Sequence, residues 1–328
     1  MSSINYFEAI VVGALQGVSE LFPVSSLGHS VLFPALVGGR WASDLSMTGT
    51  DSPYLAVLVA MHVATALALV VFFWSDWVRL IGALVGSVRR RRVRTPDERL
   101  VWLLLLATIP VGLAGLVLER ALRTTLGRPV PAAIFLALNG VVLYAAERMR
   151  RPAARAAEAG PGGAAPAGAD LVDPAATTQV IDVVDPAAPT QVIDLADPAD
   201  RRLAALSVRE AVLIGATQIL ALLPGISRSG ITIVGGLARG LRHDDAARFA
   251  FLLSTPVILA AGVLKVPGLF APEYHAVLGP ALVGSLVAGV CAYAAVRFLT
   301  SYFETRTLTP FAVYCVVVGL GSLVYLAG

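Results

Sequence analysis

The sequence predicts an all-α integral membrane protein built as an inverted-topology repeat, in which each half is one re-entrant helical hairpin plus three transmembrane helices. Hydrophobic residues make up 57% of the 328 residues and charged residues only 14%, and the mean hydropathy of +0.77 is far above that of soluble globular proteins. Six apolar runs are long enough to cross a bilayer, and two other apolar regions resemble each other. The basic residues lie in short stretches between apolar runs, which argues against nucleic acid as a partner.

The six apolar runs are predicted to be full membrane spans. A hydrocarbon core of about 30 Å requires about 20 helical residues to cross it. The runs that meet this requirement well enough are 54–74, 100–118, 130–146, 247–265, 277–299 and 309–327.

Two further apolar regions, 8–38 and 208–241, are each interrupted in the middle by Pro, Gly and Ser. The halves that remain are too short to cross a bilayer, so each region is predicted to be a re-entrant hairpin lining a cavity. A shift of 202 positions aligns EAIVVGALQGVSELFPVSSLG with EAVLIGATQILALLPGISRSG, with eight identities in 21 positions. Each half is then a hairpin followed by three spans. Because three is an odd number, the chain ends the first half on the other side of the membrane, and the second half enters the membrane from that opposite side. We expect the two hairpin tips to meet near the midplane.

The chain accordingly divides into a first repeat, 1–151, a linker, 152–202, and a second repeat, 203–328. The linker is dominated by Ala, Pro, Asp and Gly and contains the near-copies DPAATTQVIDVV and DPAAPTQVIDLA, so we expect it to be disordered. Arginine is enriched in short cytoplasmic loops, and the arginine-rich stretches 89–94 and 148–155 both follow odd-numbered spans. The linker is therefore expected in the cytoplasm, and the N-terminus and first hairpin on the outer side.

The first hairpin loop, QGVSELFPVSSLGH, carries side chains that can act on a substrate. Gln16 and Glu20 are four residues apart and share one helix face. The loop then offers hydroxyls at Ser25 and Ser26, followed by His29. A serine becomes a nucleophile when His or Glu lies within hydrogen-bonding distance as a base. Serine and proline also break membrane helices for structural reasons alone, so this pattern by itself leaves both readings open.

The second hairpin loop, LPGISRSGIT, has the composition of an anion site. It places Arg228 among the hydroxyls of Ser227, Ser229 and Thr232, and Gly230 lets the backbone approach a ligand closely. Arginine and the free N–H groups of a helix start both favour phosphate. The alternative is an arginine that extends to the membrane interface. Together the two loops predict phosphoryl transfer in a membrane cavity.

Other polar residues in the apolar segments have simpler explanations beside the functional one. His62 either faces the same cavity, as a substrate-binding residue, or forms a hydrogen bond between helices. Asn139 is expected to pack between helices. Glu8 and Glu210 are expected in the first turns of their helices, where the helix dipole favours acidic residues.

The segments ELFPVSSLGH and LLPGISRSG resemble the two signature segments of the bacterial undecaprenyl-diphosphatases, the bacitracin-resistance family. The resemblance covers nearly the whole chain apart from 152–202. It implies an inverted repeat with paired re-entrant hairpins in the bacterial plasma membrane. It also implies dephosphorylation of undecaprenyl diphosphate to the monophosphate carrier of peptidoglycan synthesis, at a site open to the outer face. The sequence is compatible with a homodimer.

The resemblance also implies roles for individual residues. Ser26 would be the nucleophile, and Glu20 a base or the ligand of a divalent cation, Mg²⁺ or Ca²⁺. His29 would transfer protons, and Arg228 would clamp the phosphate. The residues implied to bind phosphate oxygens are Ser25, Ser227, Ser229 and Thr232.

The sequence departs from the family pattern at two positions and leaves one rival function. Gln16 stands where some members carry a second glutamate, and Leu27 replaces a hydroxyl residue, so a mechanism that needs two acidic ligands is in doubt.

A polyprenyl-phosphate flippase is the rival function, because transporters also use inverted repeats with broken helices. The serine and histidine beside Glu20 favour hydrolysis. An acid-phosphatase-type lipid phosphatase would have a histidine six residues after Arg228, where this sequence has Val234.

Overall fold

The computed structural model describes residues 4–47, 52–158 and 198–328, and within them every regular element is a helix. Six helices are long and apolar enough to cross a membrane. They confirm the six predicted spans, although most extend beyond the apolar run at one end or both. The six are α4 (Pro53–Phe72), α6 (Pro96–Leu126), α7 (Pro129–Glu158), α11 (His243–Lys265), α12 (Leu278–Thr305) and α13 (Thr309–Ala327).

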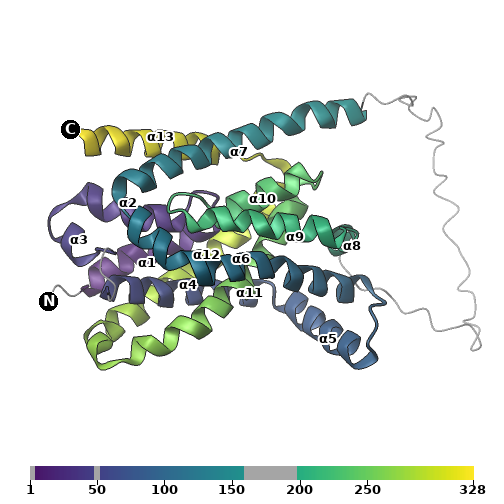
Figure 1. The fold of residues 1–328 in the computed structure, drawn as a ribbon, viewed down its shortest axis with the longest axis horizontal. Helices are drawn as coiled ribbons and strands as arrows, with labels where there is room; N and C mark the ends of the chain where they lie inside the picture. The colour runs from purple at the N-terminus through teal and green to yellow at the C-terminus, as the bar shows by residue number, and fades with distance from the viewer. Residues whose placement is uncertain (1–3, 48–51, 159–197) are drawn as a thin grey trace, which may run out of the picture.

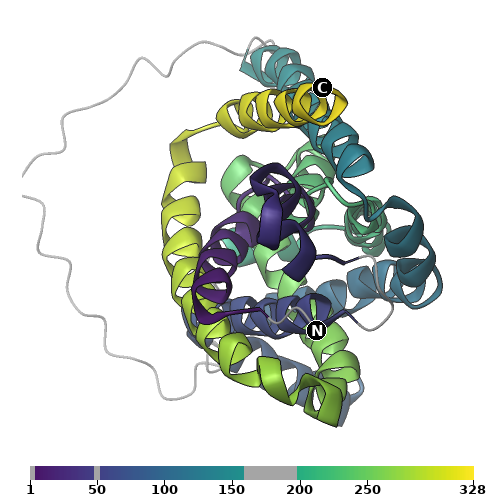
Figure 2. The same cartoon turned by 90° about the vertical axis from the view of Figure 1, so that its left-hand side faces the viewer.

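Both interrupted regions are pairs of short helices. The first comprises α1 (Tyr6–Leu21) and α2 (Ser26–Val37), and the second comprises α9 (Val208–Thr217), the 3₁₀ helix η1 (Gln218–Leu222) and α10 (Arg228–Ala238). Viewed along the bundle, both lie inside a ring formed by the longer helices (Figure 2). The first arm of each region begins with a capping box, made by Glu8 with Asn5 and by Glu210 with Ser207. The predicted first-turn placement of the two glutamates is therefore confirmed.

Close helix packing holds the two short pairs in the bundle. Gly13 of α1 lies against the backbone of Gly284 in α12, and Gly215 of α9 lies against the backbone of Ala107 in α6. A Cβ at either glycine would overlap the facing carbonyl oxygen. Small residues at such contacts let membrane helices approach closely. Gly13 and Gly215 are equivalent in the sequence repeat, and each contacts the second long span of the other half.

The remaining helices lie at the two ends of the bundle. The helix α3 (Gly39–Asp44) follows α2 at the end that carries both termini (Figure 1). The helices α5 (Trp74–Arg90) and α8 (Pro198–Ala204) lie at the opposite end. Two 3₁₀ turns, η2 (Val266–Phe270) and η3 (Pro272–Val277), connect α11 to α12. The apolar-run criterion did not predict α3, α5 or α8, because each is short or carries charges.

The structure describes only the two ends of the predicted linker. Residues 152–158 continue α7, and residues 198–202 belong to α8, so both ends of the predicted 152–202 segment are helical. Arg202 donates two hydrogen bonds of 2.7 Å to the carboxylate of Asp245 in α11. Composition alone could not predict this packing, because the partners of the charged residues lie far away in sequence. Residues 159–197 lie outside the described part of the chain.

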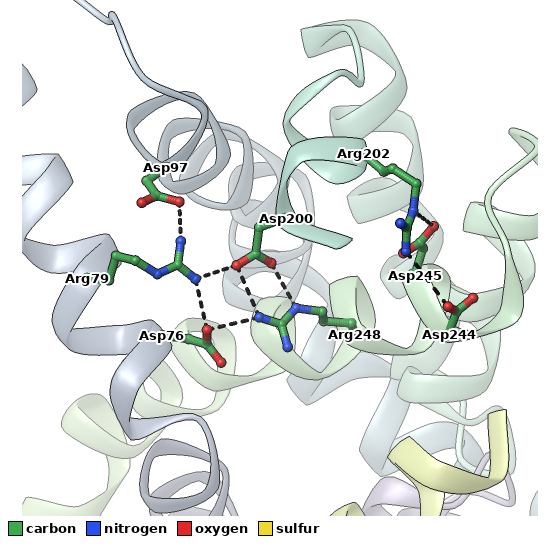
Figure 3. A network of polar contacts seen from close by, with 8 residues as sticks. All are labelled: Asp76, Arg79, Asp97, Asp200, Arg202, Asp244, Asp245 and Arg248. Carbon is green, nitrogen blue, oxygen red and sulfur yellow. Dashed lines mark hydrogen bonds and ion pairs between the residues drawn. The ribbon is translucent and has the colours of Figure 1, made fainter. Parts of the chain in front are cut away.

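A buried ion network ties α8 to three other helices (Figure 3). Asp200, which has no exposed surface, accepts hydrogen bonds from Arg79 of α5 and from Arg248 of α11, the latter at 2.8 Å. Arg79 also pairs with Asp97 of α6, and Arg248 with Asp76 of α5 at 2.9 Å. Burial alone would raise the pKa of the Asp200 carboxyl, but Arg248 and Arg79 outweigh it and hold the pKa below its usual range. This network fixes the start of the second half against the first.

Replacing Asp200 with asparagine should lower the free energy of unfolding by about 1.5–3 kcal/mol, because it removes the fully buried carboxylate that accepts hydrogen bonds from two charged guanidinium groups, while Arg79 keeps Asp97 and Arg248 keeps Asp76. Because the native pKa of Asp200 is lowered, its contribution is complete above the unfolded pKa of about 3.9 and is lost as the pH falls through the native value. The loss should therefore be fully visible at neutral pH, as a lower thermal midpoint in detergent. Replacing the exposed Glu304 with glutamine is the control, and an equal midpoint for both variants would contradict the prediction.

Candidate active site

The helix α1 carries two polar side chains into the interior on one face. Gln16 and Glu20 lie one turn apart, as predicted, and both are buried. The Gln16 amide Nε2 donates a hydrogen bond of 3.0 Å to Glu20 Oε2. The amide oxygen of Gln16 is buried and has no hydrogen-bond partner within the described residues.

The first hairpin tip aims a serine hydroxyl at the same carboxylate. Ser26, the first residue of α2, donates a hydrogen bond of 2.5 Å to Glu20 Oε2. The preceding Ser25 has φ +69°, a value that non-glycine residues rarely adopt, and its hydroxyl caps α2 by accepting from the Gly28 N–H at 3.2 Å. A strained backbone at such a position is typical of functional sites. Of the two candidate serines, Ser26 therefore contacts the Glu20 carboxylate and Ser25 shapes the loop.

Glu20 is the point at which four side chains converge. Beside Gln16 and Ser26, its Oε2 lies 3.2 Å from His62 Nε2, and its Oε1 lies 3.7 Å from Arg228 Nη1. The other ring nitrogen of His62 lies 2.8 Å from the Leu58 carbonyl oxygen. His62 thus faces the predicted site, and there it contacts the Glu20 carboxylate.

The second hairpin tip supplies the guanidinium group. Arg228 is the first residue of α10, and Ser227 caps this helix by accepting from the Gly230 N–H at 3.1 Å. The Arg228 Nη1 atom is buried and has no hydrogen-bond partner within the described residues. The side chain as a whole is 28% exposed. A guanidinium group with an unused donor at a helix start is suited to an anionic oxygen.

The remaining predicted phosphate ligands make hydrogen bonds within the protein. The Ser227 and Ser229 hydroxyls lie 3.1 Å apart, and both lie within 3.5 Å of the Phe22 carbonyl oxygen in the first tip. Thr232 donates to the Arg228 carbonyl oxygen at 2.7 Å. These hydroxyls surround Arg228 and join the two tips, and their phosphate-binding role stays a prediction.

His29 lies in the first tip but bonds away from Ser26. Its Nδ1 lies 2.8 Å from the Ser25 carbonyl oxygen, and its Nε2 lies 2.8 Å from the hydroxyl of Tyr314 in α13. The two rings are stacked, with centroids 5.7 Å apart. Both ring nitrogens are therefore engaged, and the residue that contacts the Ser26 hydroxyl is Glu20. Sequence reasoning missed Tyr314, because a tyrosine in an apolar span carries no distinguishing pattern.

The two tips touch, and Asn139 of α7 joins them. A Cβ on Gly28 of the first tip would meet Gly225 Cα of the second at 2.9 Å. The Asn139 amide donates to the Pro23 carbonyl oxygen at 3.0 Å and accepts from the Ser227 N–H at 3.1 Å. Asn139 is 1% exposed. It was predicted only to pack between helices, although a lone strongly polar residue within an apolar run was a signal of a functional position.

Replacing Asn139 with leucine should lower kcat by about a hundredfold, because a displacement of about 1 Å between the two hairpin tips, which carry Ser26 and Arg228, is enough for an effect of that size on a catalytic geometry. Leucine has a similar volume but removes both hydrogen bonds. The variant should be assayed by steady-state phosphate release. Cys315, whose sulfur lies 3.4 Å from the Asn139 amide, offers a neighbouring control: serine there should retain nearly full activity. A leucine variant with wild-type kcat would show that the two bonds do not align the tips.

The residues around Glu20 fit a divalent cation only if the substrate supplies further ligands. No group of three or more His, Cys, Asp or Glu side chains converges anywhere in residues 4–47, 52–158 and 198–328. Mg²⁺ and Ca²⁺ prefer oxygen ligands, and Mg²⁺ is commonly held by one or two carboxylates together with substrate phosphates. The Glu20 carboxylate and the unpartnered amide oxygen of Gln16 are two such oxygens.

Comparison with known proteins places this site in one family. A family model described as "Bacitracin resistance protein BacA" matches residues 9–321. The chain is 60% identical over 324 residues to "Undecaprenyl-diphosphatase" of Mycolicibacterium paratuberculosis, covering 99% of this chain and 98% of the relative. It is 52% identical over 361 residues to "Undecaprenyl-diphosphatase 1" of Frankia casuarinae, covering 97% of each, and 38% identical over 325 residues to "Undecaprenyl-diphosphatase 2" of Chromobacterium violaceum, covering 98% and 99%. The chain belongs to the BacA family of bacitracin resistance proteins.

Proposed function

We propose that this multi-pass membrane protein is an undecaprenyl-diphosphatase, which removes the terminal phosphate of undecaprenyl diphosphate. The products are undecaprenyl phosphate, the lipid carrier of peptidoglycan synthesis, and inorganic phosphate. The names of the relatives support this activity. The observation that carries it is the 2.5 Å hydrogen bond from the Ser26 hydroxyl to Glu20, beside the guanidinium group of Arg228. Such an activity confers resistance to bacitracin in this family.

In the proposed reaction, Ser26 Oγ attacks the terminal phosphorus while its proton passes to Glu20. The bond between that phosphorus and the bridging oxygen breaks, and undecaprenyl phosphate leaves. Arg228 neutralises charge on the transferred phosphoryl group. Glu20 passes its proton to the departing phosphate or to solvent, and a water molecule then attacks the phosphoserine phosphorus while Glu20 accepts a proton from that water. The bond from phosphorus to Ser26 Oγ breaks, Glu20 returns the proton to Oγ, and inorganic phosphate is released. His62 and Gln16 hold the Glu20 carboxylate in place through their contacts with Oε2.

The proposal includes an inverted repeat whose site opens to the outer side. The sequence repeat, the same order of one broken segment and three long helices in each half, and the equivalent packing of Gly13 and Gly215 support it. The arginine run at 89–94 follows α5, at the end of the bundle opposite the termini (Figure 1). Positively charged ends face the cytoplasm, so the end that carries the termini would face outward.

A divalent cation, Mg²⁺ or Ca²⁺, is part of the proposal, with Glu20 and Gln16 as the protein ligands. When bound, it would neutralise charge on the diphosphate. Treatment with EDTA should therefore abolish phosphate release, and added Mg²⁺ or Ca²⁺ should restore it. Replacing Gln16 with glutamate adds a second carboxylate, so the cation concentration for half-maximal rate should fall by about tenfold, the factor for about 1.4 kcal/mol of added binding. Release that withstands EDTA would remove the cation from the mechanism.

The direct test of the proposed function is phosphate release from undecaprenyl diphosphate by the purified protein in detergent. A polyprenyl-phosphate flippase is the alternative, which the inverted repeat would also suit. A carrier needs to bind the anion but does not need a serine hydroxyl bonded to a carboxylate, so the contact between Ser26 and Glu20 favours hydrolysis. Lipid movement across liposomes without phosphate release, by folded protein, would reverse that preference.

A further inference from the structure

The helix α5 has an apolar face that no part of the described protein covers. Five apolar side chains recur at intervals of four and three residues, which places them in one stripe along the helix. Each of the five is between 51% and 62% exposed. They are Trp74, Val78, Ile81, Val85 and Val88.

The opposite face of α5 is attached to the bundle. Leu80 is fully buried, and the Ser87 hydroxyl accepts a hydrogen bond of 3.0 Å from the Trp102 indole in α6. Arg79 lies in the ion network of Figure 3. The orientation of α5 is therefore set by the fold, and its exposed stripe is not free to turn inward.

The position of α5 along the chain places it at one membrane surface. It lies between the spans α4 and α6, which cross the bilayer in succession. At 17 residues, with charges near both ends, α5 falls short of the candidate membrane spans. A helix in this position, with one face held by protein and an apolar stripe on another, is suited to the boundary between headgroups and acyl chains.

A cluster of arginines ends the same helix. The backbone turns sharply at Arg91, which has φ +52°, and the Arg92 N–H closes the turn on the Ser87 carbonyl oxygen at 3.2 Å. Arg89, Arg91 and Arg92 lie at this turn, and all three are exposed. The neighbouring Arg90 instead pairs with Glu98 of α6. Three guanidinium groups directly beside an apolar stripe complement a surface of anionic headgroups over acyl chains.

We infer that α5 is an interfacial anchor, with its apolar stripe among the acyl chains and its terminal arginines on anionic phospholipid headgroups. The occupant of the exposed face is thus the lipid surface itself. This inference concerns a surface remote from Glu20 and does not depend on the proposed reaction. It predicts that anionic lipid gathers at this helix in preference to zwitterionic lipid.

The test uses the full-length protein in vesicles of phosphatidylcholine containing a minority of phosphatidylglycerol. A polarity-sensitive fluorophore is attached at Val85→Cys, after Cys291 and Cys315 have been changed to serine. The acyl chains of one lipid or the other are brominated, so quenching reports which lipid lies beside the stripe. Brominated phosphatidylglycerol should quench about fivefold more per mole than brominated phosphatidylcholine. This ratio is the local enrichment of anionic lipid expected if its attraction equals that of one arginine, about 1 kcal/mol.

A triple variant, Arg89→Gln with Arg91→Gln and Arg92→Gln, should bring the quenching ratio close to one. The control removes three exposed arginines from the opposite end of the bundle. It carries the substitutions Arg40→Gln, Arg120→Gln and Arg128→Gln, and it should keep the wild-type ratio. Quenching by aqueous iodide would place the stripe in water and overturn the inference. Shielding of the fluorophore from both iodide and brominated lipid would indicate a protein partner and would also overturn the inference. An unchanged quenching ratio in the triple variant would overturn it as well.

Discussion

Ser26→Ala should lower kcat for phosphate release by about ten-thousandfold or more, the size of effect seen when a nucleophile is removed. The variant loses the hydroxyl that lies 2.5 Å from Glu20 Oε2, whereas Glu20 keeps its contacts with Gln16 and His62. Substrate affinity should change little, because the phosphate clamp on the second tip remains. The measurement is steady-state phosphate release from undecaprenyl diphosphate, together with a thermal midpoint that shows the variant is folded.

The neighbouring serine provides the matched control for this result. Ser25 caps α2 and makes no hydrogen bond to the Glu20 carboxylate among the described residues, so Ser25→Ala should lower activity far less, chiefly through the lost cap, which contributes about 1 kcal/mol. If Ser25→Ala were the inactive variant, the nucleophile would be the other hydroxyl. Acid quenching during turnover should also trap a phosphoserine at Ser26, and its absence would favour direct attack by water.

Arg228→Ala should lower kcat/KM by about a thousandfold or more, because an arginine that stabilises a transferring phosphoryl group has an effect of this size. The guanidinium group also lies 3.7 Å from Glu20 Oε1, so its loss removes the positive charge nearest to that oxygen. Both KM and kcat should be affected, since in the proposed reaction the group contacts the substrate before and during transfer. Arg228→Lys should recover only part of the loss, because an ammonium group cannot fork two phosphate oxygens.

Arg239, at the other end of the same helix, is the control for Arg228. It is exposed and follows the last turn of α10, so alanine there removes an equal charge without touching the site. Its activity should match the wild type. Substantial activity in Arg228→Ala, with normal activity in Arg239→Ala, would remove Arg228 from the mechanism and leave the anion site without its main charge.

The membrane spans could be predicted well because a bilayer imposes strict lengths. A membrane span must satisfy its own backbone hydrogen bonds and cover about 30 Å, so apolar runs such as 309–327 are visible without any tertiary information. The interrupted regions were equally visible, since Pro, Gly and Ser at mid-membrane depth need a special environment. The helices α5 and α8 were not predicted, because their stability comes from contacts such as Arg79 with Asp200, which join residues far apart in sequence.

The residues of the candidate site could be predicted from the sequence, but the hydrogen bonds and ion pairs between them could not. The loop motifs identified Ser26, Glu20 and Arg228, and the structure brings all three together. The same motifs offered His29 as a possible base for the loop serines, whereas its ring nitrogens contact the Ser25 carbonyl oxygen and Tyr314. Adjacency along a loop does not determine direction, because a single unusual backbone angle, here φ +69° at Ser25, turns the following side chains.

The sequence by itself determined the membrane environment, the six spans, the two interrupted segments and the residue types available for phosphate chemistry. These follow from local properties: hydrophobicity, segment length and the backbone preferences of proline, glycine and serine. Only the tertiary structure decided which serine faces Glu20, that His62 reaches the same carboxylate, and that Asn139 holds the two tips together. The physical reason is distance along the chain. Hydrogen bonds and ion pairs between residues up to 292 positions apart depend on how helices pack, and packing depends on many weak contacts at once.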